Sequence, residues 1–378
     1  MCQSTASQMI KKIAMIFPYA PSYREGVYRL MDQELHVDWF FCGNASRNLK
    51  LLDYSMLKNC NLSMRETKSI GPFTYYKGLR SLQLSNYDVV ICAGVIRSIS
   101  EWWLIQKMWK NHSNTKICLW THGWYGKESH IQRIIKKIFF RKVDAFLLYG
   151  DYARQKMLEE GFDDRKLHVI KNSLDYNQQI KLRNRMVHTG VYKEYFKNDN
   201  PTIIFIGRIT SVKHLDLLVK AVSLLKNKGE HYNLIFVGDG EMRLALESEV
   251  KAHSLDENVW FYGTCFDEKI NAELIYNADL CVAPGNIGLT AMHALMFGCP
   301  AVSHNDFKWQ MPEFEAIKVG KTGAFFERGS VDDLAKAISN WFKCNKDNRE
   351  KVRKECYKEI DDFWNPSYQL SIIKEVIG

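Results

Sequence analysis

The stretch PTIIFIGRITSVKHLDLLVKAVSLL, residues 201–225, contains the pattern that decides the fold. A short β-rich run at 202–207 ends in a glycine, and an amphipathic segment follows near 214–228. A strand that leads through a short turn into a helix is the repeating unit of parallel sheets. The residues after Pro201 therefore predict a domain built from βα units.

The same alternation runs through nearly the whole chain. The second half predicts further strands at 233–238, 259–263, 279–284, 300–304 and 323–327 and helices near 241–253, 267–276, 288–298 and 331–343. The first half predicts strands at 12–17, 36–41, 87–94, 116–120, 144–150 and 167–170 and helices at 98–110, 129–142 and 151–160. This pattern predicts an α/β protein with doubly wound, Rossmann-like domains.

The chain length of 378 residues suits two such domains. Residues 176–200 are polar and interrupt the alternation, so we predict a linker there. The domains are then 1–175 and 201–350, followed by C-terminal helices in 351–378. Pro366 suits the first turn of the last of these helices.

The cysteines and the apolar runs indicate the cellular compartment. The ten cysteines are scattered without a CxxC pair or zinc spacing, which indicates reduced thiols. Residues 1–11 are polar, and no apolar run approaches the ~20 residues of a membrane span, so we expect a cytoplasmic protein.

The net charge of +9 predicts a polyanionic partner: nucleic acid, anionic membrane or a phosphorylated substrate. No nucleic-acid motif is present, so we expect no nucleic-acid partner.

Two strand ends in the second half are candidates for binding phosphate. Gly207-Arg208 closes the first strand, and Lys213 follows five residues later. Arginine offers a planar fork and lysine a point charge to a diphosphate, although a solvated pair of loop charges would look the same.

The second candidate is the glycine-rich turn PGNIGLT at 284–290, which opens a helix whose first amides suit an anion. No D-x-D motif is present, so we expect neither a metal nor another cofactor.

The order and spacing of several segments resemble the retaining family-4 glycosyltransferases of the GT-B fold. These segments are 205–221, 234–246, 258–263, 276–284, 288–302 and 321–326, together with LWTHG at 119–123 and VIKNSLD at 169–175. The resemblance implies two Rossmann-like domains facing across a cleft, with the C-terminal helices returning to the first. It also implies transfer of a sugar from a nucleotide diphosphate sugar with retained configuration.

The resemblance also assigns residues. The implied catalytic set is His122, Arg208 and Lys213, with the two cations holding the donor diphosphate. The implied donor-binding set is Gly207, Phe266, Asn286, Gly288, Leu289, Thr290 and His293. Within it, the amides of 288–290 cap the distal phosphate and Phe266 flanks the base.

The chain departs from the family at two positions. The family carries two glutamates eight residues apart at the glycine-rich turn, and here these positions hold Gly285 and His293. An imidazole can still hydrogen-bond a ribose hydroxyl in place of the second glutamate, the alternative being that His293 only packs its helix, but Gly285 offers only backbone. The chain is either a divergent active transferase or one that has lost donor chemistry.

The first half supplies the remaining candidates. His122 follows a strand, where it either packs against backbone or, as the resemblance implies, hydrogen-bonds the reacting sugar in the transition state. The general base that accepts the acceptor's proton would then be the departing phosphate oxygen. Tyr23 and Arg24 follow the first strand and are candidates for acceptor binding, the alternative being a solvated helix start.

Residues 129–142 combine isoleucines at helical spacing with five basic residues, including Lys136 and Lys137. This pattern is typical of a helix on anionic lipid and equally of a surface helix packed on a sheet.

We therefore predict a glycosyltransferase of surface polysaccharide or glycolipid assembly, with a UDP-sugar favoured and a lipid-linked glycan acceptor. It would be peripheral on the inner face of the cytoplasmic membrane. The alternatives are a GT-B pseudoenzyme acting as a partner subunit and a Rossmann oxidoreductase, which the missing GxGxxG disfavours.

Overall fold

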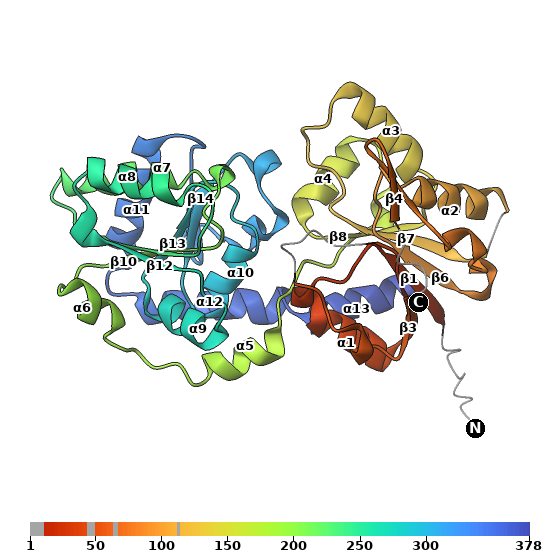
Figure 1. Ribbon diagram of the computed structural model, residues 1–378, viewed down its shortest axis with the longest axis horizontal. Helices are drawn as coiled ribbons and strands as arrows, with labels where there is room; N and C mark the ends of the chain where they lie inside the picture. Colours follow the sequence, from red (N-terminus) through yellow and green to blue (C-terminus); the bar gives the residue numbers. More distant parts are fainter. Residues whose placement is uncertain (1–10, 44–49, 63–66, 112–113) are drawn as a thin grey trace, which may run out of the picture. The chain divides into compact units, whose positions relative to one another are not determined.

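The computed structural model describes residues 11–43, 50–62, 67–111 and 114–378. The chain divides into two compact units, the first made of Met1–Asp175 with Pro366–Gly378 and the second of Tyr176–Asn365. Each unit has a parallel sheet with helices, which confirms the predicted α/β class with two Rossmann-like units (Figure 1). Within the described ranges, no helix is both long and apolar enough to cross a membrane.

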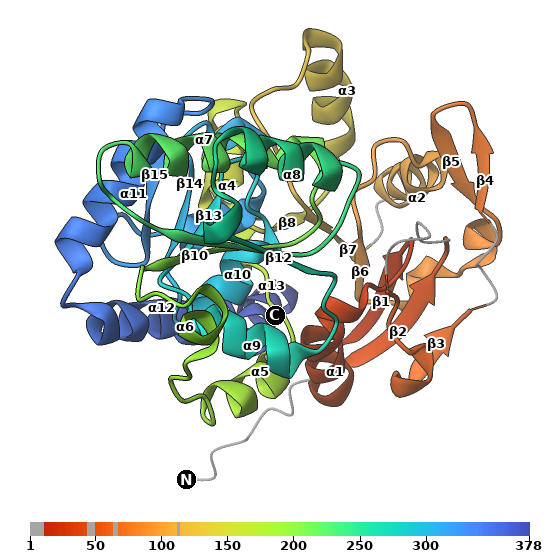
Figure 2. The same cartoon turned by 60° about the vertical axis from the view of Figure 1, so that its left-hand side comes forward.

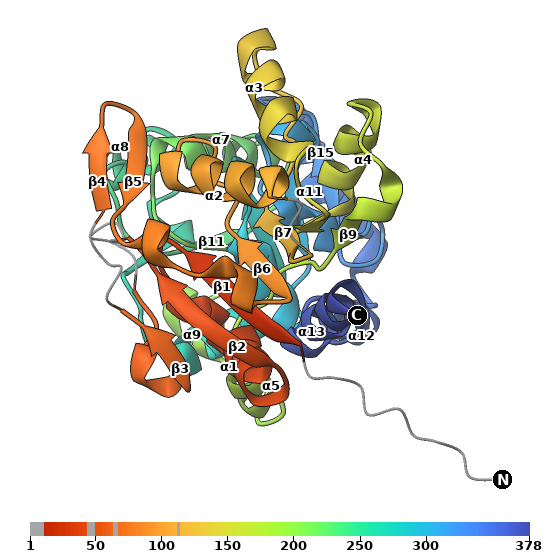
Figure 3. The same ribbon diagram turned by 90° about the vertical axis from the view of Figure 1, so that its right-hand side faces the viewer.

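The first unit is built on a seven-stranded sheet in the order β3-β2-β1-β6-β7-β8-β9, with every neighbouring pair parallel (Figure 3). Its strands are β1 Lys12–Phe17, β2 His36–Phe41, β3 Asn59–Asn61, β6 Val89–Cys92, β7 Lys116–Thr121, β8 Ala145–Leu148 and β9 Leu167–Val169. A separate antiparallel hairpin joins β4 Thr67–Ile70 to β5 Phe73–Tyr76. The sequence analysis did not predict β3 or this hairpin, because the strands have only three or four residues and β3 and β4 are largely polar.

Helices cover both faces of this sheet. Strand β1 shows why: Ile13, Met15 and Phe17 belong to one hydrophobic core, and Ala14 and Ile16 belong to the other. The first core is closed by α1 Glu25–Glu34 and α13 Pro366–Ile377. The second is closed by α2 Ile99–Lys110, α3 His130–Phe140 and α4 Asp151–Glu159.

The second unit has a six-stranded parallel sheet in the order β12-β11-β10-β13-β14-β15 (Figure 2). Its strands are β10 Thr202–Ile206, β11 Asn233–Val237, β12 Val259–Gly263, β13 Leu280–Ala283, β14 Ala301–His304 and β15 Gly323–Phe326. Its helices are α5 Tyr176–Arg183, α6 Val191–Phe196, α7 Leu215–Lys226, α8 Arg243–Ala252, α9 Glu268–Asn277, α10 Leu289–Met296, α11 Val331–Asn345 and α12 Arg349–Phe363.

The structure corrects two predicted boundaries. Residues 176–200 are not a bare linker, because they form α5 and α6 and belong to the second unit. Arg183 in α5 makes a two-pronged ion pair with Asp361 at 2.8 and 2.9 Å, which fixes both α5 and α12 in that unit. Of the predicted 351–378 helices, only Pro366–Gly378 joins the first unit.

Two turns of the second unit approach each other through a glycine. The Gly285 amide donates to the Lys213 carbonyl at 2.9 Å. A Cβ added at Gly285 would lie 2.0 Å from the Val212 carbonyl oxygen and 2.7 Å from Lys213 Cα. Both neighbours are backbone atoms, so no side chain can be placed here unless the two turns separate.

We expect Gly285→Ala to destabilise the second unit by about 1–3 kcal/mol, the usual cost of overpacking a close contact. Urea denaturation measures this change. Gly190→Ala is the matched control, because its added Cβ would have no heavy atom nearer than 3.6 Å. Equal denaturation midpoints for the two variants would contradict the close approach.

Candidate functional site

The turns after β10 and β13 lie at the carboxyl edge of the second sheet, where doubly wound units bind ligands. The Lys213 ammonium bridges these turns by donating to the Asn286 carbonyl at 2.6 Å and to its side-chain oxygen at 2.7 Å. Arg208 is exposed beside it. The structure thus brings together the three predicted residues Arg208, Lys213 and Asn286.

The charge of Lys213 is sensitive to its surroundings. Burial, and then the field of Arg208, lowers its pKa to about 8 against the opposing field of Glu313. Lys213 is therefore charged at neutral pH and close to losing its proton. Glu313 is 3% exposed and lies in a short 3-10 turn at Pro312–Ala316. The sequence analysis missed it because no motif marks that turn.

Helix α10 begins with an N-cap that leaves its first amides available. Gly288 has φ 53° and ψ −144°, a conformation open only to glycine, and it makes no side-chain cap. Across the described residues, the amides of Gly288 and Leu289 donate to no other group. The Thr290 amide instead donates to Ile287, and its hydroxyl donates to the Ile206 carbonyl at 2.9 Å. Of the three predicted amides, two remain for an anion.

The structure gives a reason for the missing first glutamate. The backbone contact at Gly285 excludes any side chain, so this position holds the turns together and presents no carboxylate. Gly207 also lies at a close approach: a Cβ on Gly238 would fall 2.0 Å from the Gly207 carbonyl oxygen. Phe266 is 92% exposed in the loop before α9, where it is free to contact a ligand.

His293 has a partner that the sequence did not indicate. The buried Gln179 of α5 places its amide nitrogen 3.3 Å from His293 Nδ1. When the amide donates to Nδ1, the neutral ring carries its proton on Nε2. Burial lowers the pKa of His293, and the field of Glu268 opposes that shift, so the ring is neutral at pH 7. His293 is thus a neutral hydrogen-bonding group whose Nδ1 contacts Gln179, and its contact with a ribose stays a prediction.

In the first unit, the structure brings Arg24 and His122 together through Tyr149. Arg24 ends the 3-10 turn after β1, His122 follows β7 and Tyr149 follows β8. Arg24 Nη2 donates to the Tyr149 hydroxyl, and the His122 ring lies 4.6 Å from the Tyr149 ring. Tyr23 lies against the same guanidinium, 5.7 Å from ring centre to Cζ. Tyr149 was missed, although its place at the end of a predicted strand could have marked it.

His122 is neutral over a wide pH range. Burial, then the fields of Arg24 and Lys136, lowers its pKa to about 4. Its Nδ1 is buried without a hydrogen-bond partner. A neutral imidazole here can donate or accept a hydrogen bond but brings no charge.

The basic helix differs from the prediction in one respect. Lys136 is 7% exposed and pairs with Glu128 at 2.6 Å, so it faces the core and not a lipid surface. The isoleucines face outward, and their exposed fractions are 69% for Ile131, 47% for Ile134, 40% for Ile135 and 50% for Ile138. Helix α3 therefore packs on the sheet through Phe139 and Phe140, as the surface-helix alternative predicts, and its isoleucines face outward together with most of its basic residues. Contact with lipid stays a prediction.

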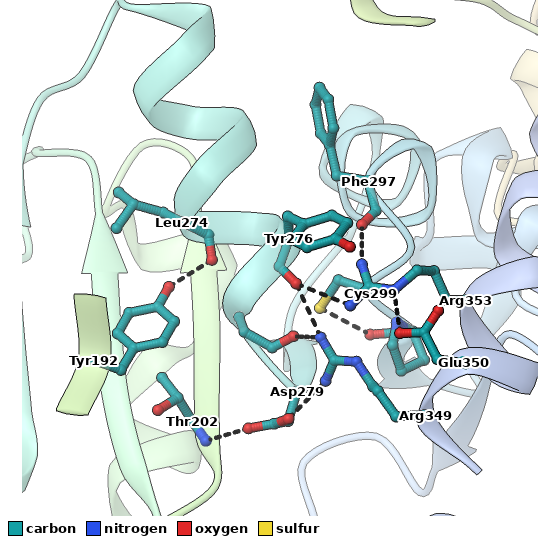
Figure 4. Close-up of polar contacts among 12 residues, drawn as sticks. Tyr192, Thr202, Leu274, Tyr276, Asp279, Phe297, Cys299, Arg349, Glu350 and Arg353 are labelled. Atoms are coloured by element: carbon teal, nitrogen blue, oxygen red, sulfur yellow. Dashed lines mark hydrogen bonds and ion pairs between the residues drawn. The ribbon is translucent and has the colours of Figure 1, made fainter. Parts of the chain in front are cut away.

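A cavity of about 550 Å³ lies elsewhere in the second unit, near the starts of β10 and β13. Its wall is organised by Arg349, which donates to Asp279 at 2.6 Å and to the Tyr276 carbonyl at 3.1 Å (Figure 4). This is the amino edge of the sheet, opposite the turns after β10 and β13. The cavity contains none of the predicted donor-site residues.

Known proteins are similar to this chain in the sequence of the second unit and in the fold. Residues 192–359 match the family model described as glycosyl transferases group 1. The putative glycosyltransferase EpsD of Bacillus subtilis is 22% identical over 323 residues, which is 80% of each chain. An uncharacterized glycosyltransferase of Methanocaldococcus jannaschii is 27% identical over 168 residues, so the match spans 41% of that relative's length.

Solved structures match nearly the whole chain. The lipopolysaccharide outer core galactosyltransferase WaaB superposes with a TM-score of 0.69 at 15% identity, covering 97% of this chain and 99% of that one. Anabaena HepE in complex with UDP gives a TM-score of 0.70 at 13% identity, with the same coverage. The chain therefore has the GT-B fold, and residues 192–359 of its second unit are similar to the group 1 glycosyl transferases.

Proposed function

We propose that the protein is a retaining glycosyltransferase that uses a nucleotide diphosphate sugar, with a UDP-sugar favoured. The observation that carries this proposal is the cationic turn pair, in which Lys213 is held by Asn286 beside the exposed Arg208. Two unoccupied amides of α10 lie in the same turn system. Together they offer charge-assisted donors to a leaving diphosphate.

In the proposed reaction, the bond between the sugar C1 and the diphosphate oxygen breaks while a bond from the acceptor oxygen to C1 forms on the same face. The acceptor hydroxyl proton passes to the departing phosphate oxygen. Arg208 and Lys213 stabilise the charge that develops on the diphosphate, so the proposal includes no metal or other cofactor. We assign His122 a hydrogen bond to the sugar in the transition state, a role suited to a neutral ring.

The proposed acceptor is a lipid-linked glycan of a surface polysaccharide or glycolipid, reached at the inner face of the cytoplasmic membrane. Support comes from α3, whose four outward isoleucines form an apolar stripe. Arg141, which directly follows α3, is exposed. The next residue, Lys142, contacts the ring of Trp109 near the C-terminal end of α2, and this tryptophan is 54% exposed. Isoleucine with flanking cations and tryptophan suits the headgroup region of anionic lipid.

The second candidate function is a partner subunit without transferase activity. The observation that favours it is Gly285, where the backbone contact excludes the glutamate that the resemblance leads one to expect. The two functions differ in nucleotide binding, which the following measurement decides.

We expect Arg208→Ala to weaken UDP binding by about 10- to 150-fold, because a charge-assisted hydrogen bond contributes about 1.5–3 kcal/mol. Calorimetry on the full chain measures this loss, with the exposed Arg185→Ala as the matched control. Transfer from a UDP-sugar should persist in EDTA.

If none of UDP, GDP, CDP, dTDP and CMP binds the wild-type chain, the partner-subunit function replaces the proposal. A specific requirement for Mn²⁺ or Mg²⁺ in the transfer step would contradict the metal-free mechanism.

The pKa of Lys213 predicts a pH dependence of binding. The protonated lysine binds phosphate, so affinity is present below a pKa of about 8 and declines as pH rises through that value. We expect UDP affinity to fall by up to about tenfold between pH 7 and pH 9. In Lys213→Arg, whose side chain stays charged, affinity should be flat over this range. Parallel profiles for the two proteins would remove Lys213 from the phosphate site.

The α3 stripe predicts lipid binding. The double variant Ile134→Asp with Ile138→Asp should reduce sedimentation with vesicles of phosphatidylglycerol and phosphatidylcholine by about tenfold or more. Each substitution removes an apolar side chain from the lipid and adds a negative charge that the anionic lipid repels. Transfer to a soluble acceptor analogue should persist. The control is Leu244→Asp, which changes a 78% exposed leucine of the second unit. Equal sedimentation of the double variant and the control would exclude this surface.

A further inference from the structure

Arg24 is a cation whose partners in the first unit are all neutral. Nη1 donates to the Tyr28 hydroxyl at 3.2 Å, and Nη2 donates to the Tyr149 hydroxyl. Among the residues that the structure describes, no carboxylate pairs with Arg24, and its Nε is buried without an acceptor. A guanidinium has five N–H donors, so most of its hydrogen-bonding capacity is not used.

Aromatic rings hold this guanidinium in place. The ring centres of Trp120 and Tyr149 both lie 5.4 Å from its Cζ, and that of Phe17 lies 6.0 Å away. Cation–π contacts of this kind recover part of the cost of moving a charge out of water. They do not supply the negative charge that a desolvated arginine ordinarily has beside it.

The surroundings of Arg24 contain further positive charge but no free negative charge. The field of Arg24 itself helps to lower the pKa of His122 to about 4, which keeps that ring neutral. The groups whose fields act on Arg24 are Tyr149, Tyr28 and Tyr23, and two acids of this unit are already paired: Glu25 with Arg29 at 2.8 Å and Glu128 with Lys136 at 2.6 Å. An anion that entered here would therefore meet an arginine, a neutral hydrogen-bonding histidine and no opposing carboxylate.

The position in the fold is that of a ligand site. Arg24, His122 and Tyr149 follow the carboxyl ends of β1, β7 and β8. Strand β1 lies between β2 and β6. The sheet first grows on one side of β1, with β2 and β3, and then on its other side, with β6 to β9, so the strand order reverses at β1. Ligands of open α/β sheets bind at such a reversal of strand order.

We propose that Arg24 binds an anionic group of the acceptor, a phosphate or a carboxylate, and that the protein selects acceptors carrying one. This inference rests on the proposed transferase function and specifies the chemistry of its acceptor. A phosphate would come from a lipid-linked diphosphate, and a carboxylate from an acidic sugar. A neutral glycan would leave the Arg24 charge unmatched.

The test compares three probes by calorimetry on the full chain: farnesyl diphosphate, glucuronate and the neutral octyl glucoside. We expect one of the two anionic probes to bind at least tenfold more tightly than octyl glucoside, and Arg24→Gln to remove that preference. A preference for farnesyl diphosphate would identify a lipid-linked diphosphate as the source of the anionic group, and a preference for glucuronate would identify an acidic sugar. The control is Arg29→Gln, which alters an exposed arginine on α1 that already pairs with Glu25 at 2.8 Å.

Arg24→Lys keeps the charge and should retain part of the preference, which guards against a failure of Arg24→Gln to fold. The proposal is overturned if the wild type binds neither anion better than octyl glucoside, or if Arg24→Gln and Arg29→Gln behave alike. UDP affinity is measured on the same samples. UDP binding that is intact in Arg24→Gln separates failure of this inference from failure of the transferase proposal.

Discussion

The backbone contact between the turns at Lys213 and Gly285 is the constraint on which the candidate donor site depends. It brings the first crossover turn of the second sheet against the turn after β13 at van der Waals distance, and only a residue without a side chain permits this. Once the turns meet, Lys213 reaches both oxygens of Asn286 and is partly desolvated. The lowered pKa of this lysine and the positions of the neighbouring amides follow from the same contact.

This constraint changes how the departure from the family pattern is understood. A glycine at position 285 appears at first to be a loss, since a carboxylate is expected there. In the structure it is instead part of the packing, and the nearby acids Glu313 and Glu268 come from other elements, close enough to shift the pKa values of Lys213 and His293. The acidic side chains near the site thus come from segments that carry no recognisable motif.

Most strands and helices could be predicted from sequence because their apolar runs and periodicities are local properties. The short polar strand β3 and the hairpin of β4 and β5 could not, since their pairing is decided by neighbours far along the chain. Arg208 and Lys213 could be predicted as site candidates because glycines and strand ends mark them. Gln179 behind His293, Tyr149 beside Arg24 and the inward turn of Lys136 depend on tertiary contacts that no local pattern encodes.

The path of the chain has a consequence for biosynthesis. Helix α13 supplies Leu370, Ile373, Val376 and Ile377 to the same core as β1, which precedes the whole second unit in the chain, and the Lys11 ammonium donates to the Ile377 carbonyl at 2.7 Å. Part of one face of the first sheet, beside α1, therefore stays uncovered until α13 has been made. The second unit, contained within 176–365, is complete earlier and can fold while the first still waits for its final helix. The first unit can therefore complete its fold only after the second unit has been synthesised.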